Sequence, residues 1–291
     1  MKKSRWLEKN GTSLAGKTVA VTGATGGLGS ALCRSILALG GSLILLNRST
    51  QKTQALCRSL LEAFPGASIS FMQLDLTDMD NVRSVCQALQ QQPLDALVLN
   101  AGAYSFPRAT CSKGYDNVFQ TNFVSHYYMV HQLLPLLSRR GGTVVAVGSI
   151  AHTYSKTDPA DIDFAGRTGA SLVYGNSKRY LMFALAELMK QTPSVRFAIA
   201  HPGISFTNIT AHYPKYLFAI IKYPMKVIFM KPALAARSLV LGLCRPIPPL
   251  SWVGPRLFNI WGNPSVKTLR TCSAQERQRI FDTAEAIYEN L

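Results

Sequence analysis

The stretch Thr18-Val-Ala-Val-Thr-Gly-Ala-Thr-Gly-Gly-Leu-Gly29 joins a short β-branched run to a cluster of glycines, and a helical pattern over residues 28–39 follows it. Glycine is needed where the backbone turns sharply and where a pyrophosphate lies against main-chain N–H groups at the positive end of a helix. Ordinary tight turns also collect glycine, so the position between a strand and a helix carries the signal. The stretch predicts the first strand, turn and helix of a dinucleotide-binding domain.

The chain up to residue 203 continues to alternate short apolar runs with helical patterns. This alternation predicts a parallel sheet covered on both faces by helices. No internal repeat and no linker rich in Gly, Ser or Pro divides the chain, so we expect an α/β fold with one doubly wound Rossmann-type domain. The expected strands are 18–22, 42–46, 68–74, 96–99, 143–147 and 194–200, and the expected helices are 28–39, 51–64, 79–91, 114–137, 172–190, 233–244 and 274–288.

Beyond Gly203 the regular alternation ends, and residues 204–232 are aromatic, basic and apolar with three prolines. An irregular segment after the last core strands usually covers a ligand crevice or makes a partner surface. The single domain, 1–291, is expected to comprise a flexible basic N-terminus (1–15), a dinucleotide-binding and catalytic core (16–203), a substrate lid (204–232) and C-terminal helices and an extension (233–291), with 246–255 as a proline-rich turn region.

Composition excludes several classes of protein. Of the 291 residues 47% are hydrophobic, which excludes wholesale disorder. The six cysteines are scattered without a CxxC pair, so we expect neither a disulfide framework nor a zinc site, and a reducing compartment. His126, His131 and His152 have no Cys or carboxylate ligands at short spacing, so no metal is expected, and His152 is expected to brace its loop. The sequence shows neither the apolar region of a signal peptide nor an apolar stretch long enough to span a membrane, so the expected location is cytoplasmic.

The formal net charge is +16, and no acidic residue lies between Glu187 and Glu276. Such charge attracts nucleic acid, an anionic membrane surface or a phosphorylated ligand, or is merely a solvated face. Lysines interleaved with aromatic residues over 211–230 fit a lid that contacts anionic headgroups, which would make the protein peripherally membrane-associated. A buried lid with snorkelling lysines is the alternative. No nucleic-acid motif accompanies the charge, so no nucleic-acid partner is expected.

Two further loops bear on the cofactor. The second strand ends at Asn47-Arg48, where an NAD-preferring fold usually has an acidic residue and an arginine suits a 2′-phosphate. These residues predict NADP(H), with a surface arginine capping a loop as the alternative. Asp75, followed by Leu76, comes after the third strand and is a candidate acceptor for an adenine amino group, although a helix N-cap explains part of the same string.

The candidate catalytic residues follow the fourth and fifth strands. Asn100-Ala101-Gly102 ends one strand, where Asn100 can pin the loop and the small residues allow close approach of a ribose. Ser149 follows the next strand, and Tyr174 and Lys178 are four apart on one helix face. A phenol is a poor base at neutral pH, and a neighbouring ammonium favours the phenolate. The pair therefore predicts proton transfer beside a nicotinamide, with Ser149 holding the substrate oxygen.

Taken in chain order, these residues resemble the short-chain dehydrogenase/reductase family over about residues 16–210. The matching set is TGxxxGxG at Thr22, Gly23, Gly27 and Gly29, then Asp75, Asn100-Ala101-Gly102, Asn122, Ser149, Tyr174-xxx-Lys178 and Pro202-Gly203 with Thr207.

The resemblance implies roles for the matched residues. Tyr174 would be the general acid/base and Ser149 the substrate-orienting hydroxyl. Lys178 would hold the nicotinamide ribose, Asn122 would position a water that links Lys178 to solvent, and Thr207 would meet the carboxamide. The expected cofactor contacts are Thr22, Gly23, Thr25, Gly27, Leu28, Gly29, Asn47, Arg48, Asp75, Leu76, Asn100, Ala101, Gly102, Tyr174, Lys178, Pro202, Gly203 and Thr207.

Two details are similar to the branch of retinol dehydrogenases and lipid-ketone reductases. Ser149 and Tyr174 are 25 residues apart, and Asp161-Ile-Asp-Phe164 lies between them. The chain departs from the usual pattern at Gly148, where serine is common, at Leu99, where a second asparagine is common, and at Arg179-Tyr-Leu181, which replaces Leu-Ala-Asn.

We therefore expect an NADP(H)-dependent oxidoreductase that interconverts a carbonyl and an alcohol on a lipophilic steroid-, retinoid- or other ketone-like or aldehyde-like substrate. A dinucleotide-bound regulatory or scaffold protein is the alternative, which the complete catalytic set disfavours. The glycine spacing and the lack of a larger C-terminal domain disfavour a sugar-nucleotide epimerase. The resemblance also implies a homodimer through the helices at 114–137 and 172–190, unless the basic tail blocks it.

Overall fold

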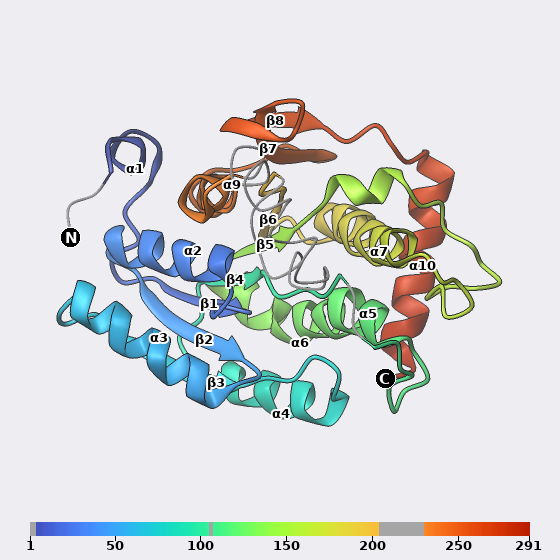
Figure 1. The fold of residues 1–291 in the computed structure, drawn as a ribbon, viewed down its shortest axis with the longest axis horizontal. Helices are drawn as coiled ribbons and strands as arrows, with labels where there is room; N and C mark the ends of the chain where they lie inside the picture. Colours follow the sequence, from blue (N-terminus) through green and yellow to red (C-terminus); the bar gives the residue numbers. More distant parts are fainter. Residues whose placement is uncertain (1–3, 105–106, 204–229) are drawn as a thin grey trace, which may run out of the picture.

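The computed structural model describes residues 4–104, 107–203 and 230–291, and its centre is an eight-stranded sheet (Figure 1). The strand order is β3-β2-β1-β4-β5-β6-β7-β8, and every neighbouring pair is parallel except the antiparallel β7–β8 hairpin. The strands are β1 (Thr18–Thr22), β2 (Ser42–Asn47), β3 (Ile69–Gln73), β4 (Ala96–Leu99), β5 (Thr143–Val147), β6 (Arg196–Ala200), β7 (Ser251–Leu257) and β8 (Trp261–Thr268).

Helices cover both faces of this sheet and give it two apolar cores. Packed on one face are α2 (Gly27–Ala38), α3 (Thr50–Ala63) and α9 (Pro232–Cys244). The other face carries α4 (Met79–Gln90), α5 (Asn117–Phe119), the π-helical turn Gln120–Val124, α6 (Ser125–Arg139), α7 (Ala170–Gln191) and α10 (Ala274–Glu289). The doubly wound α/β prediction is confirmed.

The central strands are buried on both faces, which explains why their sequences are continuously apolar. All residues of β4 and β5 are buried, and only Thr18 of β1 is partly exposed. The strand order reverses between β1 and β4, so a crevice is expected at their carboxyl ends. The glycine turn after β1 and the Asn100-Ala101-Gly102 segment after β4 both lie there.

The structure differs from the expectations at three places. A short helix, α1 (Arg5–Asn10), lies within the segment expected to be flexible; Ser4 caps it, and the Arg237 guanidinium lies 5.0 Å from the Trp6 ring centroid. Part of the expected proline-rich turn region, and the residues after it, form the β7–β8 hairpin. Pro255 is tolerated in β7 because β6 pairs only with Trp252 and Val253. The expected helix over 114–137 is interrupted by the π-helical turn.

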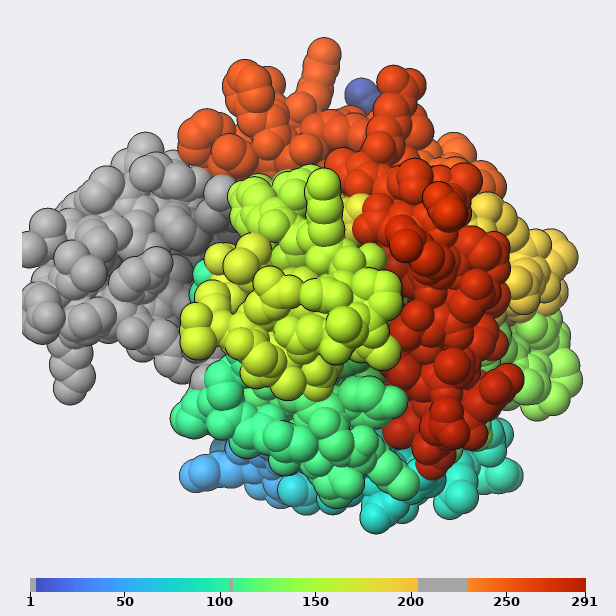
Figure 2. All heavy atoms as spheres, turned by 90° about the vertical axis from the view of Figure 1, so that its right-hand side faces the viewer, coloured from blue at the N-terminus to red at the C-terminus, as the bar shows by residue number. Residues whose placement is uncertain are grey.

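The C-terminal helix α10 covers the helices through which pairing with a second copy was expected. Ile280, Phe281, Ala284 and Ile287 of α10 are buried in the core shared with α6 and α7. At its far end, Tyr288 stacks on the His131 ring with centroids 4.2 Å apart. Figure 2 shows α10, in red, lying across this side of the molecule. The faces of α6 and α7 on which α10 packs are therefore part of the core of this chain.

No helix among the described residues is long and apolar enough to span a bilayer.

Candidate active site

The glycine turn after β1 is packed against the segment after β4. Gly23 has a φ of +65°, and a Cβ there would lie 2.8 Å from the Cα of Ala101. A Cβ on Gly29 would lie 2.5 Å from the Gly23 carbonyl oxygen. Both approaches are closer than real Cβ atoms tolerate, so these positions require glycine.

Asn100 and Thr22 join the two strand ends by hydrogen bonds. The Asn100 Nδ2 group donates to the carbonyl oxygens of Thr22 (2.9 Å) and Gly23 (3.0 Å). In return, the Thr22 hydroxyl oxygen accepts from the backbone N–H groups of Asn100 (3.0 Å) and Ala101 (2.9 Å). This mutual set fixes the turn against the crevice.

The start of α2 has the features of an anion site. Its N-cap is Gly26, so no side chain caps the N–H groups of the first turn, which includes Gly27, Leu28 and Gly29. Asn47, at the end of β2, accepts from the Thr25 N–H through Oδ1 (3.1 Å).

Two groups beside this turn lack partners among the described residues. Asn47 Nδ2 is buried without a hydrogen-bond partner there. Arg48 is exposed, and it makes no hydrogen bond or ion pair within the described part of the chain. A glycine cradle, an orphaned amide donor and an unpaired guanidinium together fit a phosphate-bearing dinucleotide.

The loop after β3 is fixed by its own hydrogen bonds and by bonds from neighbouring helices. Asp75 Oδ1 accepts from both the N–H (2.9 Å) and the hydroxyl (2.7 Å) of Thr77, so this carboxylate is partly engaged. Asp78 caps α4, as the alternative interpretation of the string supposed. Leu76 is buried in the core, and its carbonyl oxygen accepts from the Ser125 hydroxyl (2.6 Å).

Asn122 lies in the π-helical turn and is fully buried. Its side-chain Oδ1 accepts from the Ala103 N–H (2.7 Å), and its Nδ2 donates to the Ala103 carbonyl (2.8 Å) and to the Ser177 hydroxyl (2.9 Å). The side chain therefore ties the loop after β4 to α7. Such π-helical turns are frequent at functional sites.

Ser149, Tyr174 and Lys178 meet at the same end of the sheet. Ser149 follows β5, and its side chain hydrogen-bonds with Tyr174. The buried Lys178 Nζ donates to the Val147 carbonyl (2.9 Å) and lies 5.8 Å from the centre of the Tyr174 ring. A Cβ on Gly102 would lie 3.5 Å from that Nζ, so the ammonium lies directly beside the segment that follows β4.

The pKa values in this group differ from the expectation that the ammonium acidifies the phenol. Burial raises the pKa of Tyr174 to about 12, and the hydrogen bond to Ser149 is what opposes this rise. Burial lowers the pKa of Lys178 to about 8 because its charge is desolvated. Tyr174 thus keeps its proton at neutral pH, and Lys178 has a pKa close to neutrality.

Tyr104 is a crevice residue that the sequence reasoning missed. Its ring lies 5.3 Å from that of Tyr174 at an angle of 59°. Its place two residues after Gly102 was the only available signal.

Pro202 and Gly203 follow β6 and are buried; Gly203 has a φ of +79°, and a Cβ there would lie 2.6 Å from the Ile260 carbonyl oxygen. Thr207 lies outside the described residues, as do residues 204–229 of the lid expected over 204–232; Pro232, the last residue of that range, begins α9.

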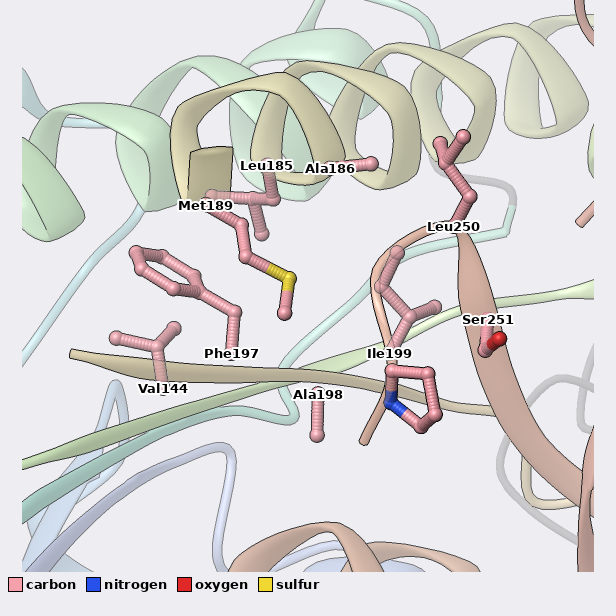
Figure 3. Close-up of a pocket in the computed structure, with 10 residues that line it drawn as sticks. Val144, Leu185, Ala186, Met189, Phe197, Ala198, Ile199, Leu250 and Ser251 are labelled. Atoms are coloured by element: carbon pink, nitrogen blue, oxygen red, sulfur yellow. The ribbon is translucent and has the colours of Figure 1, made fainter. Parts of the chain in front are cut away.

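A small apolar pocket elsewhere is not a substrate site. It lies between α7 and β6 and is lined by residues such as Leu185, Met189 and Phe197 (Figure 3). Its volume of about 10 Å³ leaves room for at most about one water molecule. Leu185 and Met189 lie about three to four helical turns along α7 from Tyr174.

The comparisons with known proteins agree with this arrangement. A family model described as short chain dehydrogenase matches residues 17–215. The polyprenol dehydrogenase of Mus musculus is 28% identical over 275 residues, which are 91% of this chain and 81% of that protein. Retinol dehydrogenase 14 of Mus musculus is 29% identical, covering 79% of this chain and 74% of that protein.

Among solved structures, the Pseudomonas aeruginosa RhlG/NADP active-site complex is similar with a TM-score of 0.60 and 25% identity, over 80% of this chain and 90% of that one. The sequence match spans the glycine turn and the Ser149, Tyr174 and Lys178 cluster, and the similar solved structure has the same fold. This chain belongs to the short-chain dehydrogenase family, with retinol dehydrogenase-like members among its relatives.

Proposed function

We propose that this oxidoreductase uses NADP(H) to interconvert a carbonyl and an alcohol on a lipophilic substrate, with Tyr174 as the acid/base. The observation that carries the proposal is the meeting of Ser149, Tyr174 and Lys178 beside a glycine cradle that fits a dinucleotide. The nicotinamide supplies the hydride when bound.

Tyr174 is suited to protonate the substrate oxygen during reduction. With a pKa raised to about 12, its phenol is protonated at neutral pH and can donate to an oxygen that is gaining charge. Ser149, which hydrogen-bonds with Tyr174, holds the same oxygen. Lys178, whose Nζ lies 5.8 Å from the centre of the Tyr174 ring, holds the nicotinamide ribose when the cofactor is bound.

The choice of NADP(H) over NAD(H) is supported by the end of β2. Arg48 is exposed and unpaired within the described residues, and neither it nor Asn47 could repel a 2′-phosphate. The similar RhlG structure is a complex with NADP, as its name states. An arginine binds a phosphate with two parallel hydrogen bonds, which a ribose hydroxyl cannot match.

The lipophilic substrate is supported by the names of two relatives, a polyprenol dehydrogenase and a retinol dehydrogenase. Tyr104 contributes an aromatic wall beside Tyr174. Contact with an anionic membrane surface also remains our proposal; it rests on the sequence of 211–230, most of which lies outside the described residues. Sedimentation with neutral and anionic vesicles tests it, and equal binding to both contradicts it.

A kinetic comparison tests the function. Purified protein is given NADPH with a panel of steroid, retinoid, polyprenoid and aromatic carbonyl compounds, and NADPH consumption is followed for the natural chain and for Tyr174→Phe. We expect turnover of at least one lipophilic compound and a loss of about 10²–10⁴-fold in the variant. NADPH binding without turnover of any compound would favour the scaffold alternative.

A further inference from the structure

An arginine next to the catalytic lysine joins three separate segments. Arg179 follows Lys178 in α7, and successive residues of a helix point about 100° apart. The Arg179 side chain therefore points away from the face of α7 that carries Tyr174 and Lys178. It is 3% exposed, and it donates to Glu276 of α10 through Nε (2.8 Å) and Nη2 (2.7 Å). It also donates to the carbonyl oxygens of His152 (3.0 Å) and Thr271 (2.8 Å).

His152 carries this connection to Ser149. Its ring Nδ1 lies 2.5 Å from the Ser149 carbonyl oxygen, and its Nε2 lies 2.7 Å from the Thr271 hydroxyl. A carbonyl can only accept, so Nδ1 carries the proton. Burial lowers the pKa of the ring and keeps it neutral, so Nε2 accepts from the Thr271 hydroxyl.

We propose that Arg179, Glu276, His152 and Thr271 form a brace, named here the C-terminal brace, that positions Ser149 for the reaction. These four are positioning residues, because none of them touches the Tyr174 phenol. The inference rests on the proposed function. It assigns a catalytic purpose to the segment around 271–276, which lies outside the residues matched by the family model.

The alternative is that these contacts only attach α10 to the rest of the fold. A second ion pair between α7 and α10 provides a matched control for this alternative. Arg277 Nε donates to Glu187 Oε1 (2.8 Å), and its Nη1 donates to the Cys272 carbonyl (2.8 Å). This second ion pair also joins α7 to α10, and both carboxylates have a lowered pKa because of their arginines and other donors. Glu187 lies over two helical turns beyond Lys178, and none of its hydrogen bonds goes to the Ser149 loop.

The test compares Glu276→Gln with Glu187→Gln in the full chain. Thermal unfolding, NADPH affinity by fluorescence, kcat and KM are measured for each. We expect both variants to lose a similar amount of stability and to bind NADPH within about twofold of the natural chain. Only Glu276→Gln is expected to lose kcat, by about tenfold to a hundredfold, because small misplacement of a reacting group costs that much. Equal kcat losses at equal stability losses would overturn the brace.

Thr271 provides a second variant in case Glu276→Gln does not fold. Thr271→Val removes only the hydroxyl that holds His152, whereas Thr271→Ser keeps it. We expect a several-fold loss of kcat in the valine variant, with KM little changed, and recovery in the serine variant. An unchanged kcat in Thr271→Val contradicts the proposal.

A chain without turnover would overturn the proposed function but would leave the brace testable. Hydrogen exchange is then measured at the backbone N–H of His152, which donates to the Ser149 carbonyl (3.2 Å). Faster exchange there in Glu276→Gln but not in Glu187→Gln supports the brace. The same exchange in both variants and the natural chain contradicts it.

Discussion

The two sides of the crevice are held in place by different kinds of contact. On the cofactor side, the turn after β1 is fixed by glycine conformations and by neutral hydrogen bonds from the Asn100 side chain to two backbone carbonyl oxygens, 78 and 77 residues away along the chain. On the catalytic side, the loop of Ser149 is held by side-chain contacts that include an ion pair. Arg179 and Glu276 are 97 residues apart, and His152 and Thr271 are 119 apart.

This difference decides what each side tolerates. On the cofactor side, main-chain packing leaves no room for an added carbon atom at Gly23 and Gly29, so substitutions at these two positions should act through volume. The catalytic side depends on charge and hydrogen-bond geometry, so substitutions of equal size should suffice to disturb it. The following predictions, together with the brace variants above, test the contrast.

The largest effect is expected from Gly29→Ala. Its Cβ would meet the Gly23 carbonyl oxygen at 2.5 Å, the Ala24 Cα at 2.8 Å and the Asn100 Nδ2 at 2.8 Å, so the turn must deform. We expect NADPH affinity to fall by about a hundredfold or more, because the pyrophosphate contacts depend on the turn. Gly254→Ala is the control, since its nearest neighbour would be at an ordinary 3.5 Å. Unaltered NADPH binding in Gly29→Ala would show that the cradle is misassigned.

A smaller effect is expected from Arg48→Ala. Loss of a charge-assisted phosphate contact should reduce kcat/KM for NADPH by about tenfold to a hundredfold, and leave that for NADH nearly unchanged. The measurement is the ratio of kcat/KM for NADPH to kcat/KM for NADH, compared between the variant and the natural chain. A ratio that stays constant would mean that another group recognises the 2′-phosphate or that the enzyme does not discriminate.

The smallest effect on activity is expected from a substitution in the Glu187–Arg277 ion pair, which serves as the control for the C-terminal brace. Glu187→Gln should cost about 1–3 kcal/mol of unfolding free energy, because it removes charged hydrogen bonds, with little change in kcat. The pKa of Glu187 is lowered from 4.5 in the folded state, so its contribution is present above about pH 4.5 and is lost as pH falls further. Acid unfolding of both proteins checks this, and the stability difference should shrink below pH 4.5. If the difference in unfolding free energy between the two proteins grew as the pH fell, the expected direction of this pH dependence would be wrong.

The local patterns of the sequence predicted most of the fold and the core of the site. Strands β1, β4 and β5 begin and end at the predicted residues, because a buried parallel strand is a continuous apolar run closed by glycine or asparagine. The strand-end residues Asn100 and Ser149 were found for the same reason.

What could not be predicted depends on contacts between distant residues. In the sequence, Arg179 was noticeable only as a departure from the family pattern. Its ion pair could not be predicted, because its partner Glu276 lies 97 residues further along the chain. The π-helical turn exists where Asn122 bonds both backbone groups of Ala103, which no periodicity reveals. The β7–β8 hairpin was not predicted because its strands contain prolines and because its turn lacks the usual glycine. The turn is formed by Phe258 and Asn259, which have φ angles of 50° and 59°.

Deuterium transfer tests the central claim most directly. The protein is incubated with NADPH that carries deuterium at the transferred position and with a lipophilic ketone, and the products are analysed by mass spectrometry. Our account predicts an alcohol with one deuterium on the carbinol carbon, formed by the natural chain and far more slowly by Tyr174→Phe. Recovery of unreduced ketone from a chain that binds NADPH, or equal product from both proteins, would contradict it.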